Sequence, residues 1–139
     1  MEKFAFILHP LSLQDMEHLS PLMRYIPDTI IEACLKMKKP FKVSHITGIK
    51  SPYAEAEGWF IGCPLTAKQM VELPEEFVMD RIIESGKVAQ ELGAKIVGLG
   101  AFTSIVGDAG ITVAKNLDIA VTSGNSYTVA TAIQGTKQA

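Results

Sequence analysis

The sequence predicts a three-layer α/β domain with a mostly parallel sheet and a hairpin at one edge. One pattern behind this prediction is the amphipathic segment 74–92, which is followed directly by the short apolar run 95–99. A helix that leads into a buried strand is typical of parallel sheets. The other pattern is the alternation of apolar and polar residues over positions 41–49, which indicates a strand of a hairpin. The 139 residues suit one domain, long enough to bury roughly two thirds of its unfolded surface.

The amino-terminal part predicts one strand and two helices. Residues 4–8 form a compact apolar run that is suited to a buried strand. Ser12 then resembles an N-cap, so we expect a helix to begin there. A second helix is expected over residues 28–38, with Asp28 as its cap. The apolar sides of the two helices are expected to be Leu13, Met16, Leu19 and Met23 in the first, and Ile30, Ile31, Cys34, Leu35 and Met37 in the second.

The middle of the chain predicts the hairpin and two more helices. Residues 41–49 and 56–63 read as partner strands across a turn at 51–53. Thr66 is expected to cap a short helix that follows. The helix over 74–92 is the clearest of all, and Gly93 is a suitable stop for it. Its buried face is expected to be Met79, Ile82, Ile83, Gly86 and Ala89.

The carboxyl-terminal third continues the alternation of strands and helices. We expect a buried, parallel strand at 95–99, a helix at 111–116, a strand at 118–121 and a helix from Ser126 onward. The apolar contacts of this last helix are expected to be Val129, Ala132 and Ile133. Because the chain stops about one helix after its last strand, we interpret it as a domain of something larger.

Composition and charge exclude several classes of protein. The formal net charge is −2, and the basic cluster Lys36, Lys38 and Lys39 lies near a predicted helix end, where cations complement the helix dipole. We therefore expect no nucleic-acid partner. The opening apolar run is too short for a signal peptide or a membrane span, which predicts a cytoplasmic protein. Two cysteines and three scattered histidines predict neither a disulfide framework nor a metal site.

Two polar clusters carry the candidate binding chemistry. Thr103 and Ser104 follow one predicted strand, and the run Thr-Ser-Gly-Asn-Ser at 122–126 follows the next. Ligands of open α/β sheets bind outside the carboxyl ends of the strands, so the two clusters are expected to meet at one mouth. Hydroxyls, an amide and backbone N–H groups without a strong base suit holding a carboxylate, phosphate or carbonyl. Helix caps and turns are the structural alternative.

Two other motifs are weaker candidates. Gly98-Leu-Gly100 resembles the start of a dinucleotide fingerprint, but Thr103 occupies the third glycine position and Asp118 precedes its strand. The glycines are better explained by a close backbone approach and a turn. Cys63 follows a strand and would place a thiol at the same mouth, where a helix N-terminus or Lys68 would have to lower its pKa. An inert buried thiol is the alternative for Cys63.

Three segments resemble a known family. The runs 99–105 (Leu-Gly-Ala-Phe-Thr-Ser-Ile), 122–128 (Thr-Ser-Gly-Asn-Ser-Tyr-Thr) and 58–65 (Gly-Trp-Phe-Ile-Gly-Cys-Pro-Leu) are similar to the amino-terminal domain of cyanobacterial long-chain acyl-acyl-carrier-protein reductases. Bacterial relatives of these reductases are often described as amino-acid or shikimate dehydrogenase-like proteins. The resemblance covers most of the chain, and the first two segments are its specific part.

The resemblance implies the substrate-side domain of an NAD(P)-dependent oxidoreductase. Residues 1–139 would face a downstream Rossmann domain that binds NADP or NAD, with no cofactor on this domain alone and little catalysis by it. The substrate would be an acyl thioester, an aldehyde or a small carboxylate. Asn125 and Ser126 match the first two positions of an Asn-Thr-Asp segment of shikimate dehydrogenases, where Tyr127 departs from the aspartate. The predicted substrate-binding residues are Thr103, Ser104, Thr122, Asn125, Ser126, Tyr127 and Cys63.

A second hypothesis belongs to a different functional class. The chain would then be a stand-alone module without catalysis, which holds a small anion or a partner segment in its polar mouth. On the first hypothesis, apolar residues that face the absent cofactor domain would drive self-association, so a homo-oligomer is expected. The residues expected at that interface are Phe102, Ile105, Val106 and Tyr127.

Overall fold

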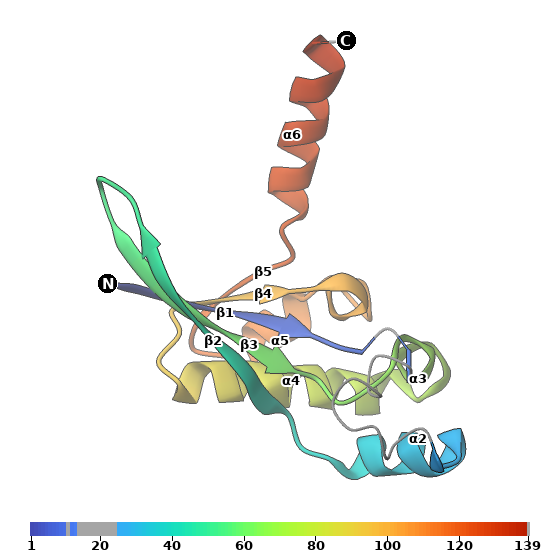
Figure 1. The fold of residues 1–139 in the computed structure, drawn as a ribbon. Helices are drawn as coiled ribbons and strands as arrows, with labels where there is room; N and C mark the ends of the chain where they lie inside the picture. The colour runs from blue at the N-terminus through green and yellow to red at the C-terminus, as the bar shows by residue number, and fades with distance from the viewer. Residues whose placement is uncertain (11, 14–24, 139) are drawn as a thin grey trace.

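The computed structural model describes all residues of the chain except 11, 14–24 and 139 (Figure 1). Its elements are β1 (Glu2–Leu8), α2 (Asp28–Met37), β2 (Phe41–Lys50), β3 (Glu55–Gly62), α3 (Ala67–Glu72), α4 (Glu75–Glu91), β4 (Ile96–Leu99), the 3-10 helix η2 (Ala101–Ser104), α5 (Ile111–Lys115), β5 (Ala120–Thr122) and α6 (Asn125–Gln138). The helix expected from Ser12 falls mainly on residues 14–24 and lies outside the described residues.

The five strands form one sheet in the order β2-β3-β1-β4-β5. The β1–β3, β1–β4 and β4–β5 pairs are parallel, whereas β2 and β3 form an antiparallel hairpin at the edge. Helices α4 and α5 lie against one side of the sheet, and α6 rises on the other side (Figure 1). The predicted class, a three-layer α/β domain with a mostly parallel sheet and an edge hairpin, is confirmed.

The strand order reverses next to the first strand. The chain places β3 on one side of β1 and then crosses to place β4 on the other side. Phe4 is in register with Ile96 and Ile7 with Leu99, so β1 and β4 end at the same edge. Such a reversal is a topological switch point, the place where α/β sheets usually bind ligands.

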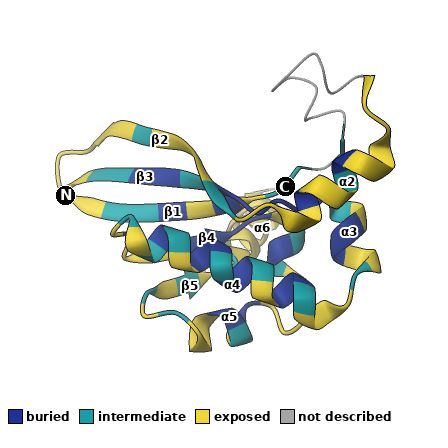
Figure 2. Cartoon of the chain, turned by 90° about the horizontal axis from the view of Figure 1, so that it is seen from below, coloured by how far each residue is buried: buried dark blue, intermediate teal, exposed yellow. Residues whose placement is uncertain are grey.

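The main core lies between the sheet and α4 (Figure 2). Ile7 and Ile61 come from neighbouring strands, and Ile82 comes from α4; all three side chains have no exposed surface. Burial of each such side chain contributes roughly 1.5–3 kcal/mol. The face of α4 predicted from its periodicity is confirmed, because its members are buried: Met79, Ile82, Ile83, Gly86 and Ala89.

Two predicted helix ends are also confirmed. Thr66 precedes α3 and forms a capping box, in which its hydroxyl accepts from the Gln69 N–H and the Gln69 side chain accepts from the Thr66 N–H. Gly93 follows α4 with a φ of 87°, in the left-handed region that a side chain would disfavour.

Helix α2 differs from the prediction in its cap and in its buried face. Pro27 occupies the N-cap position, and Asp28 is the first helical residue with no capping hydrogen bond from its side chain. In α2 only Ile31 and Leu35 are buried. The expectation that Ile30, Cys34 and Met37 are buried is wrong, because the core contact of α2 is a narrow stripe that continues to Leu13.

The last strand and helix also differ from the prediction. β5 begins at Ala120, because Asp118 is held by the Gln90 side chain: the Asp118 N–H donates to Gln90 Oε1 at 2.9 Å and Gln90 Nε2 donates to Asp118 Oδ2 at 3.0 Å. Helix α6 is present, but none of its described residues is buried. The apolar contacts expected for Val129, Ala132 and Ile133 are therefore absent within the described part of the chain.

Candidate functional site

The candidate site is the carboxyl edge of the parallel strands. β1 ends before His9, β3 before Cys63, β4 before Gly100 and β5 before Ser123. β4 and β5 are adjacent and parallel, so the two polar clusters predicted from the sequence follow neighbouring strands. The site therefore consists of four strand ends, with the switch point between β1 and β4 at its middle.

His9 bridges the two strands of the switch point. Its Nε2 accepts a 3.2 Å hydrogen bond from the Phe102 N–H, and its Nδ1 lies 3.1 Å from the carbonyl oxygen of Pro10. These partners assign the neutral tautomer with hydrogen on Nδ1. The imidazole also packs edge-to-face against the Phe102 ring, with 5.8 Å between centroids. Since both ring nitrogens are engaged, His9 positions η2.

The segment after β4 is tightly held and locally strained. Ala101 has a φ of 47°, a left-handed conformation that costs a residue with a side chain roughly 1 kcal/mol. Thr103 is buried, and its hydroxyl donates to the Gly100 carbonyl at 2.7 Å. The Ser104 hydroxyl donates to the Ala101 carbonyl at 2.7 Å. Both hydroxyl hydrogens thus stabilise the turn.

The segment after β5 presents polar groups at the same edge. Gly124 has a φ of 74°, and its N–H donates to the Thr122 hydroxyl oxygen at 3.1 Å. This turn starts α6, whose first residues Asn125, Ser126 and Tyr127 are exposed. The N–H groups of a first helical turn have no intrahelical acceptors. The amide, the hydroxyl and these N–H groups are uncharged hydrogen-bonding partners for a ligand.

Cys63 lies at the edge but is chemically inert. Its side chain is fully buried, and its N–H donates to the Leu8 carbonyl at 2.8 Å. Burial raises the pKa of the Cys63 thiol to about 11, against the lowering effect of a hydrogen bond from Ser85. The possible neighbour Lys68 instead lies 3.4 Å from Glu32 Oε1. A thiol of this kind is protonated at neutral pH and is a poor nucleophile.

A further polar cluster, formed around Glu57, was not predicted from the sequence. Glu57 Oε1 lies 3.3 Å from Lys3 Nζ, and Glu57 Oε2 lies 3.1 Å from His45 Nε2. His45 also stacks on Trp59, with 5.4 Å between ring centroids and 8° between planes. Partial burial disfavours the Glu57 charge, but hydrogen bonds and charges from Lys3 and His45 outweigh it, so the pKa of Glu57 is lowered. The period-two alternation of β2 and β3 is the signal that places His45 and Trp59 on one face.

An acidic hollow of about 720 Å³ lies elsewhere, between α4 and the loop before α5. Its carboxylates are Glu75, Glu76, Asp80 and Asp108. Asp108 accepts hydrogen bonds from the N–H and the hydroxyl of Thr112, which lower its pKa. Among the described residues no group of three or more His, Cys, Asp or Glu side chains is placed to hold a metal ion. Within the same residues no helix has the length and apolar character of a membrane span.

Comparison with known proteins shows a relative that is named an aminotransferase. No protein-family model matches the chain. The chain is 32% identical over 139 residues to the protein named aminotransferase PigE from Serratia sp. (strain ATCC 39006). The alignment covers 91% of this chain and 16% of that protein. The chain thus spans about one sixth of the length of the relative.

This comparison corrects the functional prediction. The resemblance of the three segments implies an NAD(P)-dependent oxidoreductase of the dehydrogenase type, whereas the relative is named an aminotransferase, which belongs to a different enzyme class. The assignment as an oxidoreductase is therefore wrong on this comparison. The resemblance to acyl reductases rested on short polar segments at strand ends, and turns of many α/β proteins use the same residue types. Substrate binding by Thr103, Ser104, Thr122, Asn125, Ser126, Tyr127 and Cys63 stays a prediction.

Proposed function

We propose that this chain is a substrate-binding α/β domain of a larger aminotransferase-type protein, and that its carboxyl edge holds a carbonyl compound. The observation that supports this most is the switch point between β1 and β4, where His9 fixes η2 beside the polar turn after β5. Strained backbone held in place by its surroundings is concentrated at binding sites, and Ala101 is such a residue.

The name of the relative supports the aminotransferase context. Transfer of an amino group needs a carbonyl acceptor, and aminotransferases hold pyridoxal phosphate as a Schiff base on a lysine. The described lysines do not fit that group: all are exposed except Lys3, which is half-buried and paired with Glu57. The domain is thus proposed to bind a substrate, and the amino-transfer step is assigned to another part of the protein.

The hydrogen-bonding groups at the edge favour a neutral acceptor as ligand. Asn125 and Ser126 are exposed donors at the start of α6, next to N–H groups of its first turn. A carbonyl oxygen accepts such bonds without needing a countercharge. Phe102 and Ile105 line the neighbouring turn with apolar surface, which suits the hydrocarbon part of an aldehyde or ketone.

The test is titration of the 139-residue chain with hexanal and, as matched control, with 1-hexanol, followed through backbone amide signals in NMR spectra. We expect saturable shifts for Phe102, Ser104 and Ser126 with the aldehyde and at least several-fold weaker binding of the alcohol. N125A with S126A should weaken aldehyde binding, whereas Q134A on the distal part of α6 should not. Equal binding of both compounds, or shifts confined to other regions, would overturn the proposal.

A cytoplasmic location and self-association are part of the same proposal. Cys34 is exposed and Cys63 is buried, and both are free, which suits a reducing compartment. Ile105 and Tyr127, two of the residues expected at an interface, are largely exposed. A larger apolar surface, on the side of the sheet opposite α4, is a stronger candidate for self-association.

A further inference from the structure

The side of the sheet opposite α4 has a mainly apolar surface, which we call the open face. At its margin Lys38 Nζ lies 4.1 Å from the centroid of the Phe41 ring. Paired residues place three rows of side chains on it, and the middle row crosses all five strands at Ser44, Phe60, Phe6, Gly98 and Thr122. The rows on either side contribute Ile46, Phe4, Ile96, Ala120, Phe41, Val43 and Leu8. Phe6 is 39% exposed and Leu8 is 37% exposed, although both lie on the central strand.

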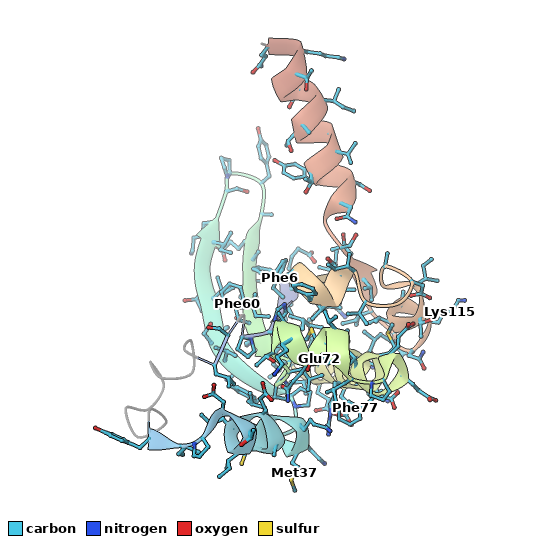
Figure 3. All side chains as sticks on the ribbon, turned by 90° about the vertical axis from the view of Figure 1, so that its right-hand side faces the viewer. Phe6, Met37, Phe60, Glu72, Phe77 and Lys115 are labelled. Atoms are coloured by element: carbon cyan, nitrogen blue, oxygen red, sulfur yellow. The ribbon has the colours of Figure 1, made fainter. Side chains whose placement is uncertain are left out.

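Aromatic rings lie over glycines and make the open face flat. A Cβ atom at Gly58 would come within 2.6 Å of the Phe4 ring, and one at Gly98 would come within 2.5 Å of the Phe6 ring. Phe6 also packs edge-to-face with Phe60, with 6.5 Å between centroids. Figure 3 shows Phe6 and Phe60 between the level of α4 and that of α6. A flat surface of this kind accepts a helix at close range.

Helix α6 has an apolar stripe that is not covered within the described part of the chain. Val129, Ala132, Ile133 and Thr136 have the spacing i, i+3, i+4 and i+7 and so share one side of the helix. The Thr136 hydroxyl donates back to the Ala132 carbonyl at 2.9 Å, which leaves its methyl group on the stripe. The 14 residues of α6 include a single charged side chain, Lys137, whereas a helix fully surrounded by water normally carries many.

We infer that two copies of this chain associate by exchanging α6, so that the stripe of each copy lies on the open face of the other. Both surfaces occur in one chain, and both are mainly apolar. A two-fold exchange therefore covers both stripes and part of each open face at once. This inference is independent of ligand binding at the carboxyl edge.

The dimensions of the two surfaces agree. A helix of 14 residues is about 21 Å long. A five-stranded sheet with spacings of about 4.8 Å is about 19 Å wide. A helix about 10 Å wide covers about 200 Å² of sheet. Reciprocal exchange buries an area of this size on each of the two helices and on each of the two sheets. The accessible area removed from water is then about 800 Å², which is in the range of a weak, transient dimer.

The structure also explains why the partner is a second copy and not the α6 of the same chain. The turn before α6 fixes its direction through the Gly124 N–H on Thr122 Oγ1 and the Thr128 N–H on the Gly124 carbonyl, both 3.1 Å. In this orientation α6 projects away from its own sheet (Figure 1). Its stripe is then available to another molecule.

Cross-linking between two differently tagged chains tests the contact directly. In a C34S background one chain carries L8C and the other carries I133C, and they are mixed under mild oxidation. We expect a disulfide between the two tags in several-fold higher yield than for I133C mixed with K87C, because Lys87 is exposed on α4. Equal yields from both mixtures would overturn the exchange. A disulfide within a doubly substituted L8C/I133C chain would show docking within one copy and would equally overturn it.

Solution mass tests the energetic role of the stripe. Sedimentation of the full chain from micromolar to millimolar concentration should show a dimer. I133E should shift the dimer to monomer, whereas Q134E, which adds the same charge on the opposite side of α6, should leave it intact. Unchanged circular dichroism and melting of the domain would show that I133E folds. A monomer at all concentrations, or a dimer that survives I133E, would refute the inference.

Discussion

The backbone N–H of Phe102 donates a 3.2 Å hydrogen bond to Nε2 of His9, across a sequence separation of 93 residues. His9 follows the central strand β1, and Phe102 lies in η2 directly after β4. The bond therefore ties together the two strand ends at the switch point. Nδ1 of the same ring faces the carbonyl of the next residue, Pro10, so the imidazole is held at the end of β1 while it binds η2.

Replacement of His9 should loosen the switch point. H9L removes the acceptor and leaves the partly buried Phe102 N–H without its partner, so we expect a loss of about 1–2 kcal/mol in the free energy of unfolding. H9Q keeps a side-chain acceptor and should lose less. Urea denaturation measures both values, and amide exchange at Phe102 reports the local effect. An H9L protein as stable as the parent would contradict a clamping role.

The stability of the domain should fall in acid through Glu57. The pKa of Glu57 is lowered in the folded protein, so its ionised form contributes to stability above its unfolded value of 4.5. That contribution is lost as the pH falls from 4.5 through the lower folded value. E57Q should therefore have a flatter dependence of melting temperature between about pH 5 and about pH 3.

The control for this titration is Glu55, a second glutamate of β3 that lies outside the cluster of Glu57, Lys3 and His45. E55Q changes a glutamate two positions earlier on the same strand, where Glu55 pairs with Lys50 at the exposed hairpin end. Its pH dependence should follow that of the parent, because exposed ion pairs contribute little. If E55Q and E57Q flattened the profile equally, the effect would reflect net charge and not the Glu57 cluster.

Local patterns predicted most of the elements because their causes are local. Thr66 caps α3 through a residue three positions later, and Gly93 ends α4 through its own backbone conformation. The carboxyl edge was also predictable, because adjacent parallel strands place the segments after them at one edge. These relationships depend on short windows of sequence and on general topology.

The remaining features depend on contacts between distant residues. The periodicity of α2 gave an apolar side, but only tertiary packing decides that Ile31 is buried and Met37 is exposed. Likewise His9 has no neighbour in sequence that indicates its bond to Phe102. Asp118 looked like the start of a strand, and its side chain is instead held by Gln90, a residue 28 positions earlier.

Addition of a methyl group at Gly98 should destabilise the sheet. Its Cβ would lie 2.5 Å from the Phe6 ring, which must move away from the strand that it covers. We expect G98A to lower the free energy of unfolding by about 1–3 kcal/mol. G135A is the control, because Gly135 in α6 has open space around it and alanine favours a helix.

A double variant distinguishes steric conflict from a backbone effect at Gly98. In F6L the smaller side chain should relieve part of the clash, so the cost of G98A should be smaller in F6L than in the parent. The double-mutant cycle measures this coupling from four unfolding curves. Additive losses would show that the glycine is needed for its backbone and not for the ring of Phe6.

The two cysteines should react with thiol reagents at very different rates. Cys34 is exposed, whereas Cys63 is fully buried and its pKa is raised to about 11 by that burial. At pH 7 the thiolate fraction of Cys63 is about one in 10⁴, and only the thiolate attacks the reagent. Native protein should thus release one equivalent of chromophore from a disulfide reagent quickly, and the second only in denaturant. C34S should abolish the fast phase, and C63S should leave it unchanged. Rapid reaction of C34S would show that the edge of β3 opens in the native state and that the thiol is available for chemistry.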